Sequence, residues 1–163
     1  MQAAPTDNPT EKFMKRAIEL SRIHMLNGVG GPFGAVIVKD GKIVAEGWNQ
    51  VTSTNDPTAH AEVTAIRNAS KFLGNFDLSG AELYTSCEPC PMCLSAAYWA
   101  RISKIYFAGT REDAARSQFD DDFIYREIPK AISERSIPMV QLLNAQANAV
   151  FREWDQLANK TRY

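Results

Sequence analysis

The segment Thr85–Cys93, TSCEPCPMC, contains all three cysteines of the chain and follows directly on an apolar run. Residues 81–86, AELYTS, are typical of a buried strand, and Pro91–Ala100 have the composition of a helix that begins with a proline. The pattern predicts a strand that turns sharply into a helix, with the cysteines in the turn. In α/β folds, functional groups collect where strands end and helices begin.

The remaining segments alternate in the same way. Apolar residues at helical spacing predict a first helix over residues 10–27, ended by Asn27-Gly28. Two β-branched runs around Asp40-Gly41 predict an antiparallel hairpin within residues 33–49. Asp56-Pro57 predicts the cap and first position of a second helix, with His60 in its first turn. Further elements are expected as strands at 103–109 and 137–143 and a helix at 147–159.

Length and composition favour one soluble α/β domain spanning residues 1–163, with residues 1–8 frayed. No apolar run approaches the roughly 18 residues of a membrane span, and the N-terminus has no apolar signal region. A cytoplasmic location is therefore expected, where thiols stay reduced. Clustered cysteines in that setting indicate metal ligands or catalytic groups rather than disulfides.

The charge balance argues against a nucleic-acid partner. The formal net charge is -1, whereas a domain that grips a phosphate backbone usually carries a basic face. The one charge-dense stretch, residues 111–127, mixes both signs around three consecutive aspartates, Asp120, Asp121 and Asp122. Such a stretch is ordinarily a solvated acidic loop.

Cys90 and Cys93 are three residues apart, so a helix that begins near Pro91 places both sulfurs on one face of its first turn. The chain has only two histidines, and His24 lies within the first predicted helix, where a packing role is expected. His60 is the candidate third ligand. One histidine and two cysteines would hold zinc with the fourth position left for water, as in a catalytic site.

Glu62 is the candidate general acid and base, because a carboxylate beside zinc-activated water can carry protons to a substrate. Residues two apart do not share a face of a regular helix, so His60 and Glu62 converge only if the helix is just beginning. Two other interpretations stay open. Cys87 could complete a closed structural site in a non-enzymatic zinc module, and C-x-x-C-x-x-C is similar to an iron–sulfur run that lacks its fourth cysteine.

The motifs His60-Ala61-Glu62 and Pro89-Cys90-Pro91-Met92-Cys93 match the H-x-E and P-C-x-x-C signature of zinc-dependent nucleobase deaminases. The chain is identified as a member of the cytidine deaminase superfamily. GGPFGAVIVKDG, NDPTAHAEVTAIR, YTSCEPCPMC, FDDDFIYREI and the terminal tyrosine resemble bacterial guanine deaminases of the small cytidine deaminase-like type. This likeness covers nearly the whole chain after residue 10.

The resemblance implies a three-layer α/β/α fold around a five-stranded mixed sheet, one zinc ion, and a homodimer whose C-terminal segments can be exchanged between protomers. Its metal ligands would be His60, Cys90 and Cys93; its catalytic residues Glu62 and Asp121; and its substrate-binding residues Asn49, Phe33, His60, Asp121 and Tyr163. Asp120 is the alternative to Asp121, and Cys87 would be a small residue near the site.

The activity that the resemblance implies is hydrolytic deamination of guanine to xanthine and ammonia. Guanine offers N1–H and an exocyclic amine, two donors that one carboxylate such as Asp121 can accept together. Guanosine, an ammeline-like triazine and adenosine in transfer RNA remain alternative substrates, since the same zinc motifs serve them.

Overall fold

The computed structural model describes residues 8–163. Within these residues the chain divides into two compact units, one ending at Asp121 and the other spanning Asp122–Tyr163. The expected fraying of residues 1–8 falls almost entirely outside the described part. Asn8, the first described residue, is the N-cap of the first helix, and its side chain accepts a hydrogen bond from the Thr10 amide.

The first unit is built on a four-stranded mixed sheet with the order β2-β1-β3-β4. The strands are β1 (Gly34–Lys39), β2 (Lys42–Trp48), β3 (Ala81–Cys87) and β4 (Lys104–Gly109). β1 pairs antiparallel with β2 and with β3, and β3 pairs parallel with β4. The predicted hairpin is confirmed: Asp40 and Gly41 have positive φ angles of 51° and 70°, as a tight turn between twisted strands requires.

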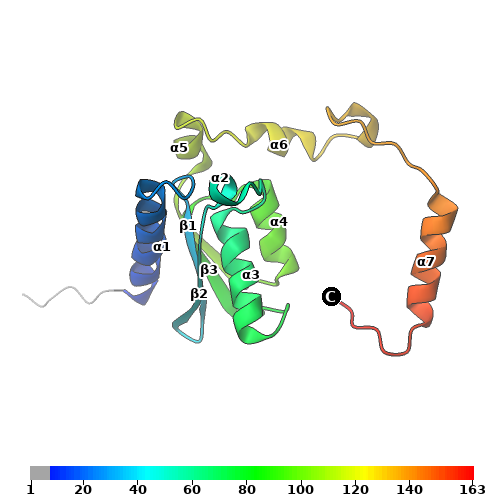
Figure 1. Cartoon of the computed structure of the whole chain (residues 1–163), viewed down its shortest axis with the longest axis horizontal. Coiled ribbons are helices and arrows are strands. Elements are labelled where there is room, and N and C mark those ends of the chain that lie inside the picture. The colour runs from blue at the N-terminus through cyan, green and yellow to red at the C-terminus, as the bar shows by residue number, and fades with distance from the viewer. Residues whose placement is uncertain (1–7) are drawn as a thin grey trace, which may run out of the picture. The chain divides into compact units, whose positions relative to one another are not determined.

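Helices cover both faces of this sheet, which confirms the three-layer α/β/α architecture (Figure 1). α1 (Pro9–Leu26) packs on one face, where Phe13 and Leu20 meet Val36 and Tyr84. α3 (Ala61–Leu73) and α4 (Pro91–Trp99) cover the other face. There the core is rich in alanine, which lets the helices lie close to the strands; its buried members include Ala35, Ile37, Ala61, Ala65, Leu83 and Ala97.

The predicted start of the second helix was wrong. A short helix α2 (Val51–Thr54) precedes a turn at Asp56-Pro57, and α3 begins only at Ala61. The Asp56 carboxylate accepts hydrogen bonds from the amide and hydroxyl of Thr58, and the His60 amide donates to the Thr58 carbonyl. These bonds close a turn before any helix can propagate. His60 is therefore the N-cap of α3, in an extended conformation, rather than a first-turn residue.

The fifth strand predicted at residues 137–143 is also wrong within the described residues, because the sheet there has four strands. A strand needs a hydrogen-bonded neighbour, and the structure pairs these residues with none of the four. The second unit instead contains α6 (Asp122–Glu127), a 3₁₀ turn (Ile132–Glu134) and α7 (Asn144–Gln156). α5 (Arg111–Arg116), at the end of the first unit, was not predicted. Across residues 8–163, no helix combines the length and apolar character needed to span a membrane.

Candidate metal centre and active site

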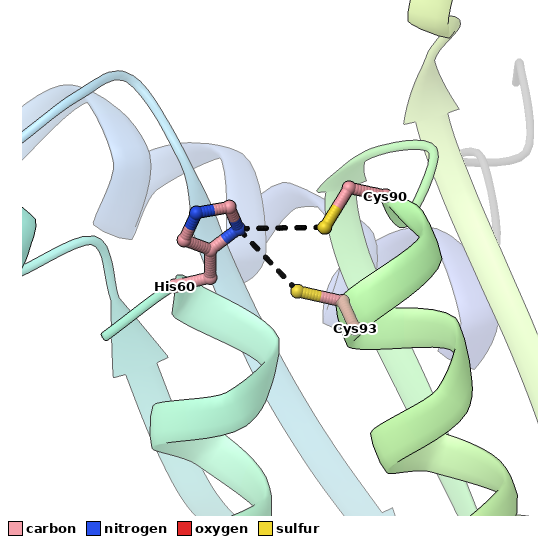
Figure 2. A group of neighbouring side chains, drawn as sticks. All are labelled: His60, Cys90 and Cys93. Carbon is pink, nitrogen blue, oxygen red and sulfur yellow. Dashed lines mark hydrogen bonds between the residues drawn. The ribbon is translucent and has the colours of Figure 1, made fainter. Parts of the chain in front are cut away.

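Two helix starts bring the three predicted metal ligands together. His60 is the N-cap of α3, Cys90 is the N-cap of α4, and Cys93 lies in the first turn of α4 behind Pro91. Figure 2 shows the His60 ring pointing at both sulfurs across the gap between the two helices. The positive ends of two helix dipoles therefore meet at this group, and they favour thiolate over thiol.

The distances within this group match a tetrahedral zinc site. His60 Nδ1 lies 3.6 Å from Cys90 Sγ and 3.5 Å from Cys93 Sγ. Zinc bonds of about 2.0–2.1 Å to nitrogen and 2.3 Å to sulfur, at tetrahedral angles, put nitrogen and sulfur ligands about 3.6 Å apart. The residues present therefore fit zinc. In the described part of the chain, they are also the group whose candidate ligand atoms lie within 4.8 Å of one another.

The pKa shifts of the two thiols also fit a metal site. Contact with the Cys93 thiol and with His60 lowers the pKa of Cys90, whereas contact with Cys90 and burial raise the pKa of Cys93. The hydrogen bond with Cys90 also raises the pKa of His60. The three side chains therefore hold protons at the place where a bound divalent cation would supply the positive charge instead.

Glu62 borders the metal group as predicted. Its side chain is 6% exposed, and its Oε2 lies 3.4 Å from Cys93 Sγ. Burial raises the pKa of this carboxyl above its ordinary value. The difficulty that residues two apart do not share a helix face disappears, because His60 stands outside the helix as the N-cap while Glu62 lies in the first turn.

Asn49, directly after β2, is 7% exposed and organises the neighbouring loop. Its Oδ1 accepts hydrogen bonds from the amides of Gly31 and Val51, each at 3.2 Å. A Cβ atom on Gly30 would lie 2.1 Å from the Asn49 carbonyl oxygen, so only glycine fits there. This role of Gly30 was not predicted from the sequence, although adjacent glycines are a signal of close backbone approach.

Phe33 precedes β1 and is partly buried against the core under α3. Its ring meets Phe119 edge to face, with centroids 4.9 Å apart and planes at 88°. A side chain on Gly31 would touch both rings. Phe119 was not predicted as part of this region, because its position follows from the path of the chain after α5 rather than from a local motif.

Asp121 fits the site better than Asp120. Asp121 is half-buried and close enough for its charge to affect the pKa values of His60 and Cys87. Burial raises the pKa of Asp121 itself, and the charge of Cys90 raises it further. Asp120 is exposed. Tyr163 belongs to the second unit, and its role stays a prediction.

Cys87 and His24 have packing contacts away from the metal ligands. The Cys87 thiol donates to the Thr110 carbonyl at 3.6 Å, and burial raises its pKa to about 11. His24 stacks on Trp48 with ring centroids 3.7 Å apart, in line with the expected packing role. This geometry disfavours a closed site with Cys87 as fourth ligand.

Comparison with known proteins agrees with the geometry. The family model "Cytidine and deoxycytidylate deaminase zinc-binding region" matches residues 7–109. The chain belongs to this family of zinc-binding deaminases, and zinc is its metal.

Proteins with two different activities are among the similar proteins. The chain is 56% identical to a guanine deaminase of Bacillus subtilis over 94% of its own length and 98% of the relative. The crystal structure of guanine deaminase from B. subtilis superposes with a TM-score of 0.91 at 56% identity, covering 94% of this chain and 98% of that one. A tRNA-specific adenosine deaminase of Haemophilus influenzae is 40% identical over 69% of this chain and 68% of its own.

Proposed function

We propose that the protein is a zinc-dependent guanine deaminase, which hydrolyses guanine to xanthine and ammonia. The observation that carries this proposal is the open three-residue metal group beside the buried carboxylate of Glu62. It occurs in a chain 56% identical, over nearly its full length, to a guanine deaminase. The residues match what a catalytic rather than a structural zinc site requires.

His60, Cys90 and Cys93 would hold the zinc ion, which when bound would supply an activated water by lowering its pKa toward neutrality. Deamination adds the oxygen of one water molecule at C2 of guanine and releases ammonia from the same carbon. Glu62 accepts the proton that the water gives up and returns it to the leaving nitrogen. Its burial beside Cys93 keeps it within reach of the reacting atoms.

Asn49 and Asp121 orient the purine. The hydrogen bonds that engage the Asn49 side chain within the described residues use Oδ1, so the amide Nδ2 is the group left to donate. Asn49 therefore binds an acceptor atom of the purine. Asp121 accepts from N1–H and the exocyclic amine, and Phe33 stacks on the ring. The half-buried position of Asp121 near His60 supports this arrangement.

The test is an assay of the zinc-loaded protein with guanine, guanosine, adenine and cytidine, following ultraviolet absorbance and released ammonia. The expected result is turnover of guanine, with His60→Ala protein as the inactive control. If guanine yields no ammonia while one zinc is bound per chain, the proposed substrate is wrong. Turnover of guanosine in its place would support the same mechanism with a different substrate.

Deamination of adenosine in transfer RNA is the second candidate, because relatives with that activity share the zinc-binding region. The net charge of -1 and the acidic stretch at residues 120–122 disfavour a polyanionic substrate. A binding assay with transfer RNA at moderate salt decides between the two. Tight binding that weakens steeply with salt would favour the transfer RNA substrate.

We further propose a homodimer in which C-terminal segments are exchanged. Among the described strands, β4 pairs only with β3, which leaves its outer edge open. Large apolar side chains are exposed in both units, such as Tyr98 at 77% and Val140 at 78%. In the dimer, the partner's Tyr163 closes the substrate site.

Mixed dimers test the exchange. A dimer of one Glu62→Gln chain and one Tyr163→Ala chain has one intact glutamate. If the Tyr163 of one chain acts on the site of the other chain, the site with the intact Glu62 receives an intact Tyr163. Each mixed dimer should then show about half of the activity of a wild-type dimer. If tyrosine acts within its own chain, no recovery occurs, and the exchange is excluded. Light scattering gives the oligomeric state independently.

A cytoplasmic location fits this proposal. The metal group needs Cys90 and Cys93 as free thiolates, and all three cysteines are unpaired in the structure. Reducing compartments keep such thiols available for metal. Fractionation of cells that express the tagged protein tests the location.

A further inference from the structure

One peptide group in the first unit is held on both sides by consecutive side chains of the cysteine segment. The Cys87 thiol donates to the Thr110 carbonyl at 3.6 Å, and the Arg111 amide donates to Glu88 Oε2 at 3.1 Å. The carbonyl of Thr110 and the amide of Arg111 belong to the same peptide group. We call this arrangement the peptide clamp.

The peptide clamp begins where the parallel pairing of β3 and β4 ends. Cys87 and Gly109 are the last paired residues of the two strands, and the Glu88 amide donates to the Gly109 carbonyl at 2.8 Å. Beyond this point the sheet no longer fixes the chain. The side chains of Cys87 and Glu88 extend the connection by one peptide group, to the first residue of α5.

The segment that starts at the peptide clamp leads to the candidate substrate site. α5 begins at Arg111 behind a capping box formed by Thr110 and Asp113. The Phe119 amide then donates to the Ala114 carbonyl at 3.1 Å, and the Phe119 ring meets Phe33. Asp121 follows two residues later. We refer to residues 111–121 as the aspartate arm.

We propose that Cys87 and Glu88 are positioning residues, which fix the aspartate arm to the same loop that carries the metal ligand Cys90. This places Phe119 and Asp121 relative to the zinc through one short, rigid connection. The inference rests on the proposed role of Asp121 in binding guanine. It also gives the third cysteine a function other than metal binding, because a buried thiol keeps its proton and can donate.

Arg111 provides a clean test. It is the first residue of α5, where proline is tolerated, and Thr110 before it is extended, as a residue before proline prefers. Arg111→Pro therefore removes the amide donor to Glu88 and keeps the helix start. Arg111→Ala is the matched control, since it removes the same side chain and keeps the amide.

We expect Arg111→Pro to raise amide exchange in residues 112–119 and to raise KM for guanine at least fivefold, with one zinc still bound per chain. Arg111→Ala is the reference for KM, because the side-chain charge that acts on Asp121 is lost in both variants, and its amide exchange should stay close to that of wild type. Glu88→Ala should behave like Arg111→Pro, and Glu88→Gln, which keeps an acceptor oxygen, should restore KM. In an Asp121→Ala background, Arg111→Pro should add little, because the two changes act through one contact.

Equal behaviour of Arg111→Pro and Arg111→Ala in exchange and in KM would overturn the inference. A full additional loss in the Asp121→Ala background would overturn it as well, because the effect would then not pass through the arm. Asp121→Ala with wild-type kinetics would instead remove the proposed role of Asp121. The exchange comparison would still decide whether the peptide clamp fixes residues 112–119.

Discussion

Glu62 Oε2 lies 3.4 Å from Cys93 Sγ, so the buried carboxylate touches a ligand atom of the metal group rather than only facing the site. Both side chains are buried, so a proton that moves beside them needs a fixed carrier in place of bulk water. Glu62 is the residue in that position.

Replacement of Glu62 by glutamine should remove turnover while the zinc stays bound. Glutamine has the same shape but cannot accept a proton, so kcat should fall roughly 10²–10⁴-fold, the usual contribution of general acid–base catalysis. Steady-state kinetics with metal analysis of the same sample measures both quantities. A variant with near wild-type kcat would exclude Glu62 as the proton carrier.

Removal of zinc should destabilise the fold as well as stop catalysis. An ion that binds only the folded state adds about 2.7 kcal/mol to the free energy of unfolding at a concentration 100 times Kd. Denaturant unfolding with and without a chelator should show this difference for the wild type and for Cys87→Ala, but not for Cys93→Ala. If Cys87→Ala also lost the zinc-dependent increase in the free energy of unfolding, Cys87 would be a ligand, and the interpretation as a closed structural site would be supported.

Asn49→Asp should weaken substrate binding more than it disturbs the fold. Aspartate keeps the oxygen that accepts from Gly31 and Val51, but it loses the amide donor. A lost hydrogen bond and a new charge facing an acceptor should raise KM for guanine about tenfold or more. Asn49→Ala, which loses both functions, should also lower the melting temperature. Equal KM for wild type and Asn49→Asp would show that Asn49 only organises the loop.

The metal group could be predicted from the sequence because its determinants are local. Proline at the start of a helix fixes the geometry of Cys90 and Cys93, and a cap position frees His60 from helical spacing. The start of α3 could not be predicted, because Asp56 and Pro57 have the residue types of a helix start. Only the bonds between Asp56 and Thr58 show that the chain turns there instead.

Features that depend on distant segments were harder to predict. Residues 137–143 have the composition of a strand, but composition cannot supply a neighbouring strand. The approach of Phe119 to Phe33 depends on the path of the chain through α5, which a charged sequence does not reveal. The peptide clamp likewise joins residues more than twenty positions apart.

Asp56 should make stability depend on pH in the acid range. Hydrogen bonds from Thr58 lower its pKa below the ordinary value of 3.8, so the folded state favours the carboxylate. Its stabilisation is therefore fully present above 3.8 and is lost as the pH falls through the lower folded pKa. Wild type should exceed Asp56→Asn in stability near neutral pH, and the gap should close in acid. A gap that is constant with pH would contradict this assignment.

Gly47→Ala should move α3 and thereby damage the site from a distance. Gly47 lies in β2 under the first turns of α3, and a Cβ there would lie 2.3 Å from the Ala61 carbonyl oxygen and 2.4 Å from the Ala65 amide nitrogen. Both are backbone atoms, so relief requires the helix to shift. Such overpacking typically costs about 1–3 kcal/mol. Because His60 and Glu62 flank Ala61, the shift should also weaken zinc affinity and lower kcat.

Gly41→Ala, whose Cβ meets no atom within 4 Å, is the comparison in the same hairpin: strain at its positive φ should lower stability but leave zinc affinity unchanged. Equal zinc affinity in the two variants would show that the close packing of α3 on β2 does not set the metal site.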